Sequence, residues 1–276
     1  MIDRAIELKA DRGASSALSG ASVALVFDLP STRTRISFEV GVRELGGSPI
    51  VLRQGELQLA RGESLRDTAL VLSRYVQLIA LRTGPHATIE GLARHSDVPV
   101  VNMLTEDHHP LQALADLMTL RERFGELAGL KLVYVGDGNN TARSLMILGA
   151  KAGLEMVVAS PPELAPSPVA SGVMVVDDPR AAAEGAHALY TDVWVSMGDE
   201  AEAKQRRKLL APYRLDEALL ERARGDAVAL HCLPAHPGDE ISEAVLYGDR
   251  SAVWDQAENR LHAQKALLEF LIAAPS

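Results

Sequence analysis

The run Ser31-Thr32-Arg33-Thr34-Arg35 places three hydroxyl groups and two guanidinium groups side by side, a composition suited to binding a phosphate. The apolar spacing that follows predicts a helix closed by Gly46-Gly47, with Ser31 or Thr32 as its N-cap. A helix N-terminus presents free N–H groups and a partial positive charge to an anion. The alternative is a plain capped helix whose arginines pair with Asp28 and Glu39, and this run alone does not decide between the two.

Arg82, His109 and Gln112 are three further polar residues that could hold a small ligand. Arg82 follows the apolar run Leu78–Leu81, and a charge at the end of a buried strand requires a partner or a ligand. The alternative for Arg82 is a buried salt bridge. His109 and Gln112 are three residues apart around Pro110, which favours a helix start, so both can face one ligand. A histidine here can donate a hydrogen bond to a carbonyl oxygen, whereas an isolated histidine more often caps a helix.

The segment Gly136-Asp137-Gly138-Asn139-Asn140 resembles a dinucleotide-binding turn only in part. Thr141 stands where the third glycine of that pattern belongs, and no acidic residue for a ribose ends the apolar run Met156–Ala159. These departures disfavour a nicotinamide-dependent oxidoreductase. We interpret the two asparagines as polar groups that face a ligand.

Two more polar clusters follow apolar runs in the second half of the chain. Asp192 opens the segment 192–198, and its carboxylate could hold a substrate ammonium group, with an N-cap and turn as the alternative. Cys232 lies beside His231 at the end of another predicted strand, where a buried structural thiol is the alternative to a role in the site. One cysteine and scattered histidines lack zinc-ligand spacing, so we expect neither a metal nor a cofactor.

Short apolar runs alternate with helical patterns along the whole chain, which predicts an α/β fold with two mainly parallel sheets flanked by helices. A last helix is expected over about 257–272, with its apolar residues on one side. Strands are expected at Val23–Phe27, Pro49–Leu52, Leu78–Leu81, Val98–Val101, Leu132–Val135, Met156–Ala159, Ala188–Tyr190 and Val228–Leu230, with a weaker one at Val173–Val176.

The helix from His109 to about Phe124 is expected to connect two domains, residues 1–118 and residues 119–256, with a terminal helix at 257–276 that packs back on the first. The polar clusters described above all follow predicted strands. Ligands of open parallel sheets bind outside the carboxyl ends of the strands, so we expect these clusters to converge on one cleft between the two domains.

The composition excludes several other classes of protein. A formal charge of −9 and an aromatic share of 4% disfavour nucleic-acid binding, which uses basic surfaces and stacking platforms. No apolar run is long enough to span a bilayer, and the N-terminus lacks the apolar core of a signal peptide. The single cysteine fits a reducing compartment, so we expect a cytoplasmic protein.

Taken together, eight clusters resemble those of the aspartate/ornithine carbamoyltransferase family, and its ornithine branch most closely. The resemblance covers nearly the whole chain, and the clusters occur in the order that the family shows. They are Ser31–Arg35, Gln58–Ser64, Arg82-Thr83, His109–Gln112, Gly136–Asn140, Asp192–Gly198, His231–Pro234 and Asp255–His262.

The resemblance implies transfer of the carbamoyl group of carbamoyl phosphate to the side-chain amine of L-ornithine, which gives L-citrulline and phosphate. It implies Arg82, His109 and Cys232 as catalytic residues and a cis Leu233-Pro234 bond. It further implies a homotrimer, or a multiple of trimers, in which Gln58 reaches the phosphate site of a neighbouring subunit. Carbamoyl phosphate binding is implied for Ser31, Thr32, Arg33, Thr34, Gln58, Arg82, His109, Gln112, Cys232, Leu233 and Arg260, and ornithine binding for Asn140, Asp192, Ser196 and Met197.

The chain departs from the family pattern at several points, none of which removes a named ligand. It begins inside what looks like the family's first helix, has Gly84 where an aromatic is common, and is short over 160–178. Pro237 follows His236 where ornithine enzymes often have arginine. Two alternatives therefore stay open: a related carbamoyltransferase with another amine acceptor, and a non-catalytic paralogue that binds a phosphate ligand.

Overall fold

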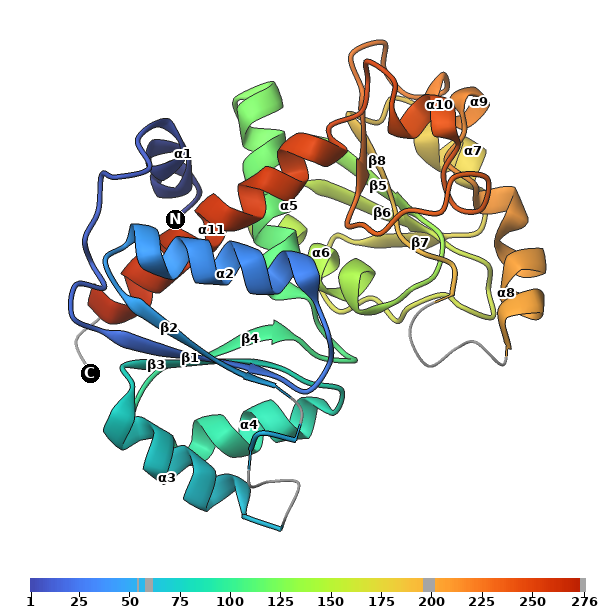
Figure 1. Ribbon diagram of the computed structural model, residues 1–276. Helices are drawn as coiled ribbons and strands as arrows, with labels where there is room; N and C mark the ends of the chain where they lie inside the picture. Colours follow the sequence, from blue (N-terminus) through green and yellow to red (C-terminus); the bar gives the residue numbers. More distant parts are fainter. Residues whose placement is uncertain (54, 58–61, 196–201, 274–276) are drawn as a thin grey trace. The chain divides into compact units, whose positions relative to one another are not determined.

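The computed structural model describes residues 1–53, 55–57, 62–195 and 202–273. The chain divides into two compact units, Met1–Met118 with Asn259–Ser276 as the first and Thr119–Glu258 as the second. The first unit contains a sheet with the strand order β2-β1-β3-β4, and the second a sheet with the order β7-β6-β5-β8-β9 (Figure 1). Every pairing in both sheets is parallel, which confirms the expected α/β class.

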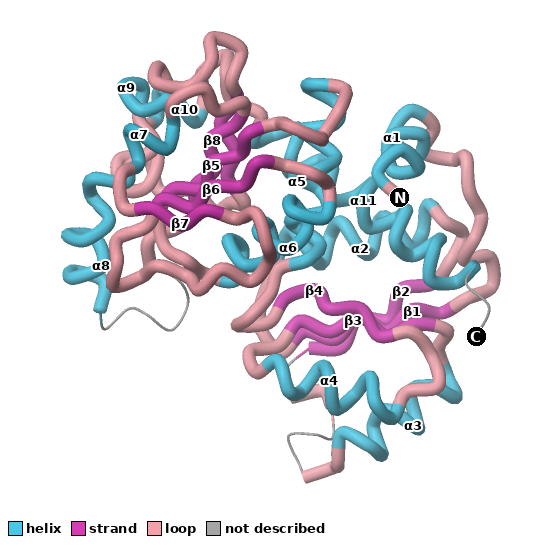
Figure 2. The backbone as a smooth tube through the Cα atoms, turned by 180° about the vertical axis from the view of Figure 1, so that it is seen from behind, coloured by secondary structure: helices cyan, strands magenta, loops and turns pink. Residues whose placement is uncertain are grey.

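In the first unit, helices cover both faces of the sheet (Figures 1 and 2). Successive strand residues point to opposite faces, so Leu25 and Leu78 pack towards α2, α5 and α11, while Val26 and Ile79 pack towards α3 and α4. The strands are β1 (Ser22–Phe27), β2 (Ser48–Arg53), β3 (Leu78–Arg82) and β4 (Val100–Leu104). The helices are α1 (Ile2–Ala10), α2 (Thr32–Glu44), α3 (Leu65–Tyr75), α4 (His86–His95), α5 (Pro110–Phe124) and α11 (Val253–Ala273).

The second unit has the same kind of layering. Val133 and Leu189 pack in one core with α7 and with the short helices that follow β8, and Met156 on the other face contacts α6 near Gly149. Its strands are β5 (Lys131–Val135), β6 (Glu155–Ala159), β7 (Met174–Val176), β8 (Ala188–Thr191) and β9 (Val228–His231). Its other elements are α6 (Asn140–Lys151), α7 (Pro179–Ala183), α8 (Ala203–Leu210), the 3₁₀ helix η3 (Ala211–Tyr213), α9 (Glu217–Leu220) and α10 (Glu243–Leu246).

All nine expected strands are present, with one displaced along the chain. The strand expected at Val98–Val101 pairs only from Val100 and runs on to Leu104. Pro99 explains the late start, because its nitrogen cannot donate to a neighbouring strand.

The prediction for the last helix was wrong in two respects. The helix α11 begins at Val253 rather than near Ala257. It is also buried on more than one side, since Asn259, His262 and Lys265 are all fully buried. Lys265 donates hydrogen bonds to the Glu44 carboxylate on α2 and to the Arg12 carbonyl, so a polar residue that the pattern places outside is held by an internal ion pair.

In each sheet the strand order changes direction at one place. From β1 the chain continues to β2 on one side and then to β3 on the other, and from β5 it continues to β6 and later to β8. Such switch points leave room for a ligand at the carboxyl ends of the two strands. The residues that follow β1 and β3, and those that follow β5 and β8, are therefore placed for binding. No helix among the described residues combines the length and apolarity needed to cross a membrane.

Candidate functional site

The run Ser31–Arg35 lies at the N-terminus of α2, which is the first half-site. Ser31 is the N-cap, and its hydroxyl accepts a hydrogen bond from the Thr34 N–H at 3.3 Å. The buried Thr34 hydroxyl in turn accepts a hydrogen bond from Nη2 of Arg260 on α11 at 2.6 Å. A guanidinium from the end of the chain is thereby fixed beside a helix N-terminus, where both favour an anion.

The two arginines of the run have different surroundings. Arg35 Nε lies 2.7 Å from Glu39 Oε1, and Arg43 bonds the other oxygen of the same carboxylate at 3.3 Å. The alternative of a surface ion pair is thus correct for Arg35. Arg33 is exposed and close enough to lower the pKa of His109, so it belongs with the half-site.

Arg82 and His109 lie with the same half-site because β1 and β3 are neighbours. Phe27 pairs with Arg82 in the sheet, and the N–H of the next residue, Asp28, donates to the Arg82 carbonyl at 2.9 Å. His109 is buried, and this burial together with Arg260, Arg82 and Arg33 lowers its pKa well below the ordinary 6.5. A neutral imidazole results at neutral pH, which can still donate one N–H to a carbonyl oxygen.

Gln112 lies in the first turn of α5 and is 1% exposed. Its side-chain NH₂ donates to Oδ1 of Asp116, one helical turn further on, at 2.8 Å. Asp116 is itself fully buried. Gln112 was expected in the site and Asp116 was not, although the spacing of four residues could have pointed to it.

In the second unit the sheet register brings three predicted clusters together. Val135 pairs with Thr191, and Thr191 pairs with His231, so β5, β8 and β9 end side by side. The Thr191 hydroxyl also donates to the Val135 carbonyl at 2.9 Å. The residues that follow these ends, among them Asp192 and Cys232, therefore meet at one edge of the sheet.

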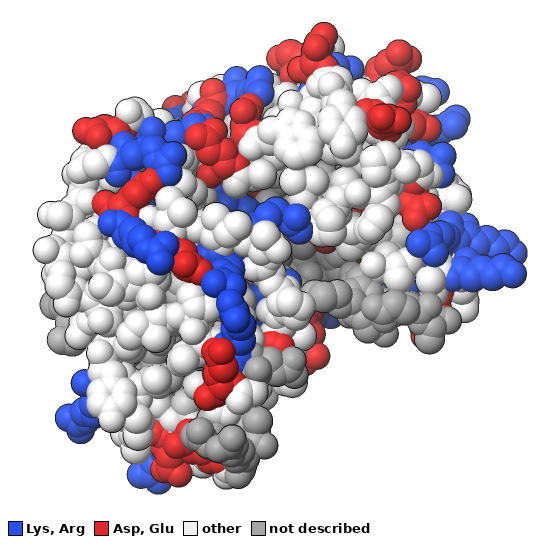
Figure 3. Space-filling model, viewed as in Figure 1, with Lys and Arg blue, Asp and Glu red and all other residues white. Residues whose placement is uncertain are grey.

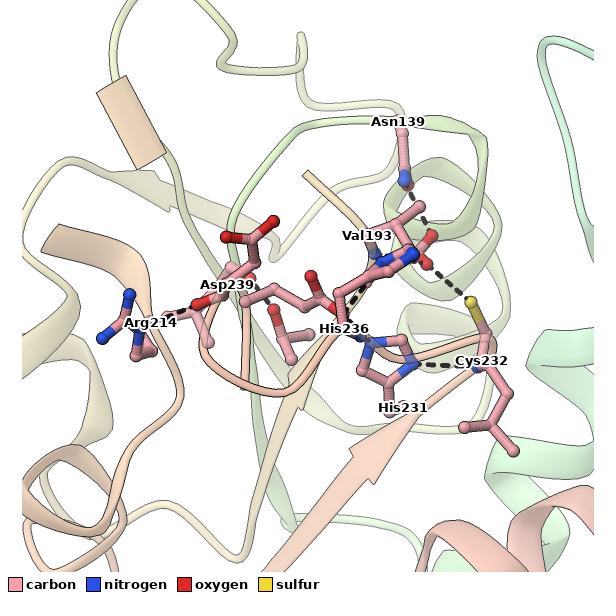
Figure 4. A network of polar contacts seen from close by, with 12 residues as sticks. Asn139, Val193, Arg214, His231, Cys232, His236 and Asp239 are labelled. Atoms are coloured by element: carbon pink, nitrogen blue, oxygen red, sulfur yellow. Dashed lines mark hydrogen bonds and ion pairs between the residues drawn. The ribbon is translucent and has the colours of Figure 1, made fainter. Parts of the chain in front are cut away.

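Asp192 is the centre of a hydrogen-bond network at this edge (Figure 4). Its Oδ1 accepts from the Cys232 thiol at 2.7 Å and from the Val193 N–H at 2.8 Å, and its Oδ2 accepts from the Asn139 side-chain NH₂ at 2.8 Å. A carboxylate offers about four acceptor positions. The described residues use three of them, so that within this part of the chain one position on Oδ2 can accept from a further donor such as an ammonium group.

Asn139 has two functions that sequence analysis did not separate. It is the N-cap of α6, because its side-chain oxygen accepts from the N–H groups of Thr141 and Ala142. The same oxygen accepts from the Tyr134 hydroxyl at 3.2 Å. Burial and the nearby Asp192 raise the pKa of Tyr134 well above 10.0, so this hydroxyl keeps its proton. The expectation that both asparagines face a ligand is wrong for Asn139, while Asn140 begins the helix and is half-buried.

His231 fixes the backbone that carries Cys232 and Leu233. Its Nδ1 accepts from the Leu233 N–H at 2.8 Å, so in the neutral ring the proton is on Nε2, which lies 3.1 Å from Oε1 of Glu240. Leu233 has a φ of 57°, unusual for a residue with a side chain. The expected cis Leu233-Pro234 bond is confirmed. Glu240 is fully buried in the structure. The sequence Gly238-Asp239-Glu240, which is typical of an exposed turn, does not predict this burial.

Asp192, His231 and Cys232 also present ligand atoms within 4.8 Å of one another, a grouping that sequence spacing did not reveal. Each of the three side chains takes part in the hydrogen bonds described above.

Gln58, Ser196 and Met197 lie outside the described residues. The remaining expected residues fall into two half-sites, one in each unit. The first holds Ser31, Thr32, Arg33, Thr34, Arg82, His109, Gln112 and Arg260, and the second holds Asn140, Asp192, Cys232 and Leu233.

Comparison with known proteins identifies the class. Residues 1–122 match the carbamoyl-P binding domain of the aspartate/ornithine carbamoyltransferases, and residues 128–271 match their Asp/Orn binding domain. The chain belongs to the aspartate/ornithine carbamoyltransferase family.

Within that family, several of the similar proteins are named ornithine carbamoyltransferase. A relative from Acidothermus cellulolyticus, called ornithine carbamoyltransferase, is 55% identical over 287 residues, covering 99% of this chain and 92% of the relative. The ornithine carbamoyltransferase structure from Pyrococcus furiosus has a TM-score of 0.94 at 44% identity, with 100% of this chain and 93% of that chain covered. The structure from Thermus thermophilus gives 0.92 at 45% identity, covering 98% and 93%.

The buried His109 predicts how stability responds to acid. In the unfolded chain this residue titrates at its ordinary 6.5, whereas in the folded protein its pKa is well below that value. As the pH falls below 6.5, the unfolded state binds a proton that the folded state does not, so stability present above 6.5 is lost on acidification. In urea unfolding, we expect His109→Gln to lose less unfolding free energy than the wild type between about pH 7 and about pH 5. Val71→Ala supplies the control, since this exposed residue of α3 has no titratable group and its variant should keep the wild-type slope. An unchanged slope in His109→Gln would contradict the assignment.

Proposed function

We propose that this chain is an enzyme that transfers the carbamoyl group of carbamoyl phosphate to the side-chain amine of L-ornithine, giving L-citrulline and phosphate. The observation that carries the proposal is the half-site of the first unit. There the Arg260 guanidinium donates a hydrogen bond to the Thr34 hydroxyl, and the nearby His109 is neutral. That arrangement suits a phosphate attached to a carbonyl group. The names of the similar proteins support the same reaction.

On the donor side, each group has a defined task. Ser31, Thr32, Arg33, Thr34 and Arg260 bind the phosphate, through the helix N-terminus, hydroxyls and guanidinium groups. Arg82 and His109 donate to the carbonyl oxygen. When the amine attacks the carbonyl carbon, these donors stabilise the charge that develops on that oxygen. The bond between carbon and the phosphate oxygen then breaks, and phosphate leaves with the electron pair.

On the acceptor side, the free position on Asp192 Oδ2 accepts from the ammonium group at the amino-acid end of ornithine. Asn140, Ser196 and Met197 complete this part of the site, and Cys232 and Leu233 line the region near the reacting amine. The amine must be neutral to attack, so it loses a proton before or during the step. The leaving phosphate is a candidate acceptor for that proton. Direct transfer requires both half-sites to act on one pair of substrates.

We extend the proposal to a homotrimer, or a multiple of trimers, with shared active sites. A groove of about 700 Å³ runs along α2 and is lined by Ser31 and Thr32 together with Ile36, Arg43 and Arg53. Ile36 is 56% exposed, so this groove presents apolar as well as charged surface. Figure 3 shows a band of cationic side chains interrupted by carboxylates over α2. A neighbouring copy that brings Gln58 to this groove would cover the apolar surface and complete the phosphate site.

A cytoplasmic location is also part of the proposal. It is supported by the single cysteine of the chain, whose thiol donates to Asp192 and is placed to act in its reduced form.

The decisive assay compares acceptors. Purified protein with carbamoyl phosphate should form citrulline from L-ornithine. It should give much less product with N-acetylornithine or putrescine, which lack a free α-ammonium group for Asp192 to accept from, and with aspartate, which has no side-chain amine. Colorimetric detection of the ureido product measures all four reactions side by side. Folded protein that forms no product with any acceptor would exclude the enzyme and favour a phosphate-binding paralogue. A preference for another amine would identify a different carbamoyltransferase.

Arg82→Ala separates a catalytic from a structural role for this buried arginine. Loss of one donor to the developing oxyanion lowers turnover by roughly 10²–10³-fold in enzymes of this type. We expect a loss of this size in citrulline formation, with a much smaller change in the urea midpoint. Arg94→Ala, at an exposed arginine of α4 in the same unit, should leave both unchanged. An Arg82→Ala protein that fails to fold would favour a buried salt bridge instead.

The shared-site proposal predicts complementation between two inactive variants. In mixed trimers of Gln58→Ala and Arg82→Ala subunits, an intact Arg82 on one subunit meets an intact Gln58 from its neighbour. Activity after joint refolding should therefore exceed the sum of the separate activities. Mixtures of Arg82→Ala with His109→Ala serve as the control, since both residues lie in the same half-site of their own subunit. Equal recovery in both mixtures, or in neither, would contradict a contribution from Gln58 to its neighbour.

A further inference from the structure

The side-chain amide of Gln112 is almost fully buried, yet only one of its two polar atoms makes a hydrogen bond among the described residues. Its NH₂ group donates to Asp116 Oδ1 at 2.8 Å. Its Oε1 is buried and has no hydrogen-bond partner among the described residues. Leaving such an acceptor unsatisfied is costly, so it indicates a donor that arrives with a ligand.

The direction of the Gln112 amide follows from the chemistry of its partner. An ionised carboxylate can only accept hydrogen bonds, so the group that faces Asp116 is the NH₂. The oxygen of the same amide must then face the other way. Because Asp116 is fully buried and both residues lie on α5, the contact is protected from water and its geometry is set by the helix.

The acceptor that results lies one helical turn from His109. Gln112 N–H donates to the His109 carbonyl at 3.2 Å, at the start of α5. Arg82 and Arg260 supply donors only, since arginine has no acceptor, and the neutral His109 can offer one N–H. A substrate with a carbonyl oxygen and an NH₂ group on the same carbon satisfies both kinds of partner.

We propose that Asp116 is a positioning residue that orients the Gln112 amide, so that the donor site accepts a carbamoyl group and rejects an acetyl group. Acetyl phosphate differs from carbamoyl phosphate by a methyl group in place of NH₂. It would leave Gln112 Oε1 unsatisfied, and sites built to bond a substrate N–H discriminate strongly against analogues without it. This inference rests on the proposed function for the identity of the donor substrate.

Binding of three ligands in the absence of an amine acceptor tests the inference. Calorimetry would compare carbamoyl phosphate, acetyl phosphate and inorganic phosphate on the wild type and on Asp116→Asn. The asparagine keeps the shape of Asp116 but can donate as well as accept, so it no longer fixes the Gln112 amide. We expect the affinity for carbamoyl phosphate to fall roughly tenfold or more, while affinities for acetyl phosphate and inorganic phosphate stay within about twofold.

Two further variants keep the test decisive. Gln112→Leu removes the acceptor itself and should abolish the preference for carbamoyl over acetyl phosphate, whether or not Asp116→Asn folds. Asp97→Asn changes an exposed aspartate of the first unit and should bind all three ligands as the wild type does.

Several outcomes would overturn the inference. Equal weakening of all three ligands by Asp116→Asn would indicate a structural role only, and a carbamoyl preference retained by Gln112→Leu would exclude the amide as its source. A wild type that binds both acyl phosphates equally would also overturn it, even if citrulline forms. If the preference is present but no citrulline forms, the proposed function fails and the role of Asp116 stands.

Discussion

Both half-sites depend on the register of parallel strands, which brings residues far apart in the sequence to one edge of a sheet. Asp192 and Cys232 are forty residues apart, yet they meet because Thr191 and His231 are paired at the ends of β8 and β9. Arg82 reaches the N-terminus of α2 for the same reason, through its pairing with Phe27. A slip of one residue in either pairing would turn these side chains to the opposite face of the sheet. The apolar strands that build the two cores therefore also determine where the polar groups lie.

The first half-site gathers positively charged side chains around a buried histidine. Burial, together with the charges of Arg260, Arg82 and Arg33, lowers the pKa of His109 and keeps this side chain neutral. The chain as a whole carries −9, so this concentration of positive charge is a local feature of α2, β3 and α11. In the proposed function a phosphate dianion offsets this positive charge, which would couple ligand binding to stability. The same electrostatics leave the histidine as a neutral donor, as polarisation of a carbonyl group requires.

The sequence predicted the elements better than the contacts among them. Parallel strands buried on both faces are continuous apolar runs, and all nine could be located, with an error of two residues where Pro99 delays the pairing of β4. The burial of α11 on more than one side was missed because its buried Lys265 looks like a surface residue until Glu44 is seen beside it. The structural roles of Asn139 and Asp116 were missed for a related reason. Each acts on another side chain rather than on a ligand, and residue type alone does not show that relation.

The phosphate half-site has a further property that follows from the bond between Arg260 and Thr34. The two residues belong to one compact unit, but the whole second unit is encoded between the segments that form it. Translation proceeds at roughly 5–20 residues per second, so Arg260 is synthesised roughly 10–45 seconds after its partner Thr34 at the start of α2. The second unit is continuous in sequence and can fold as it emerges. Synthesis therefore completes the half-site of the second unit before that of the first unit. The hydrogen bond between Arg260 and Thr34 forms last.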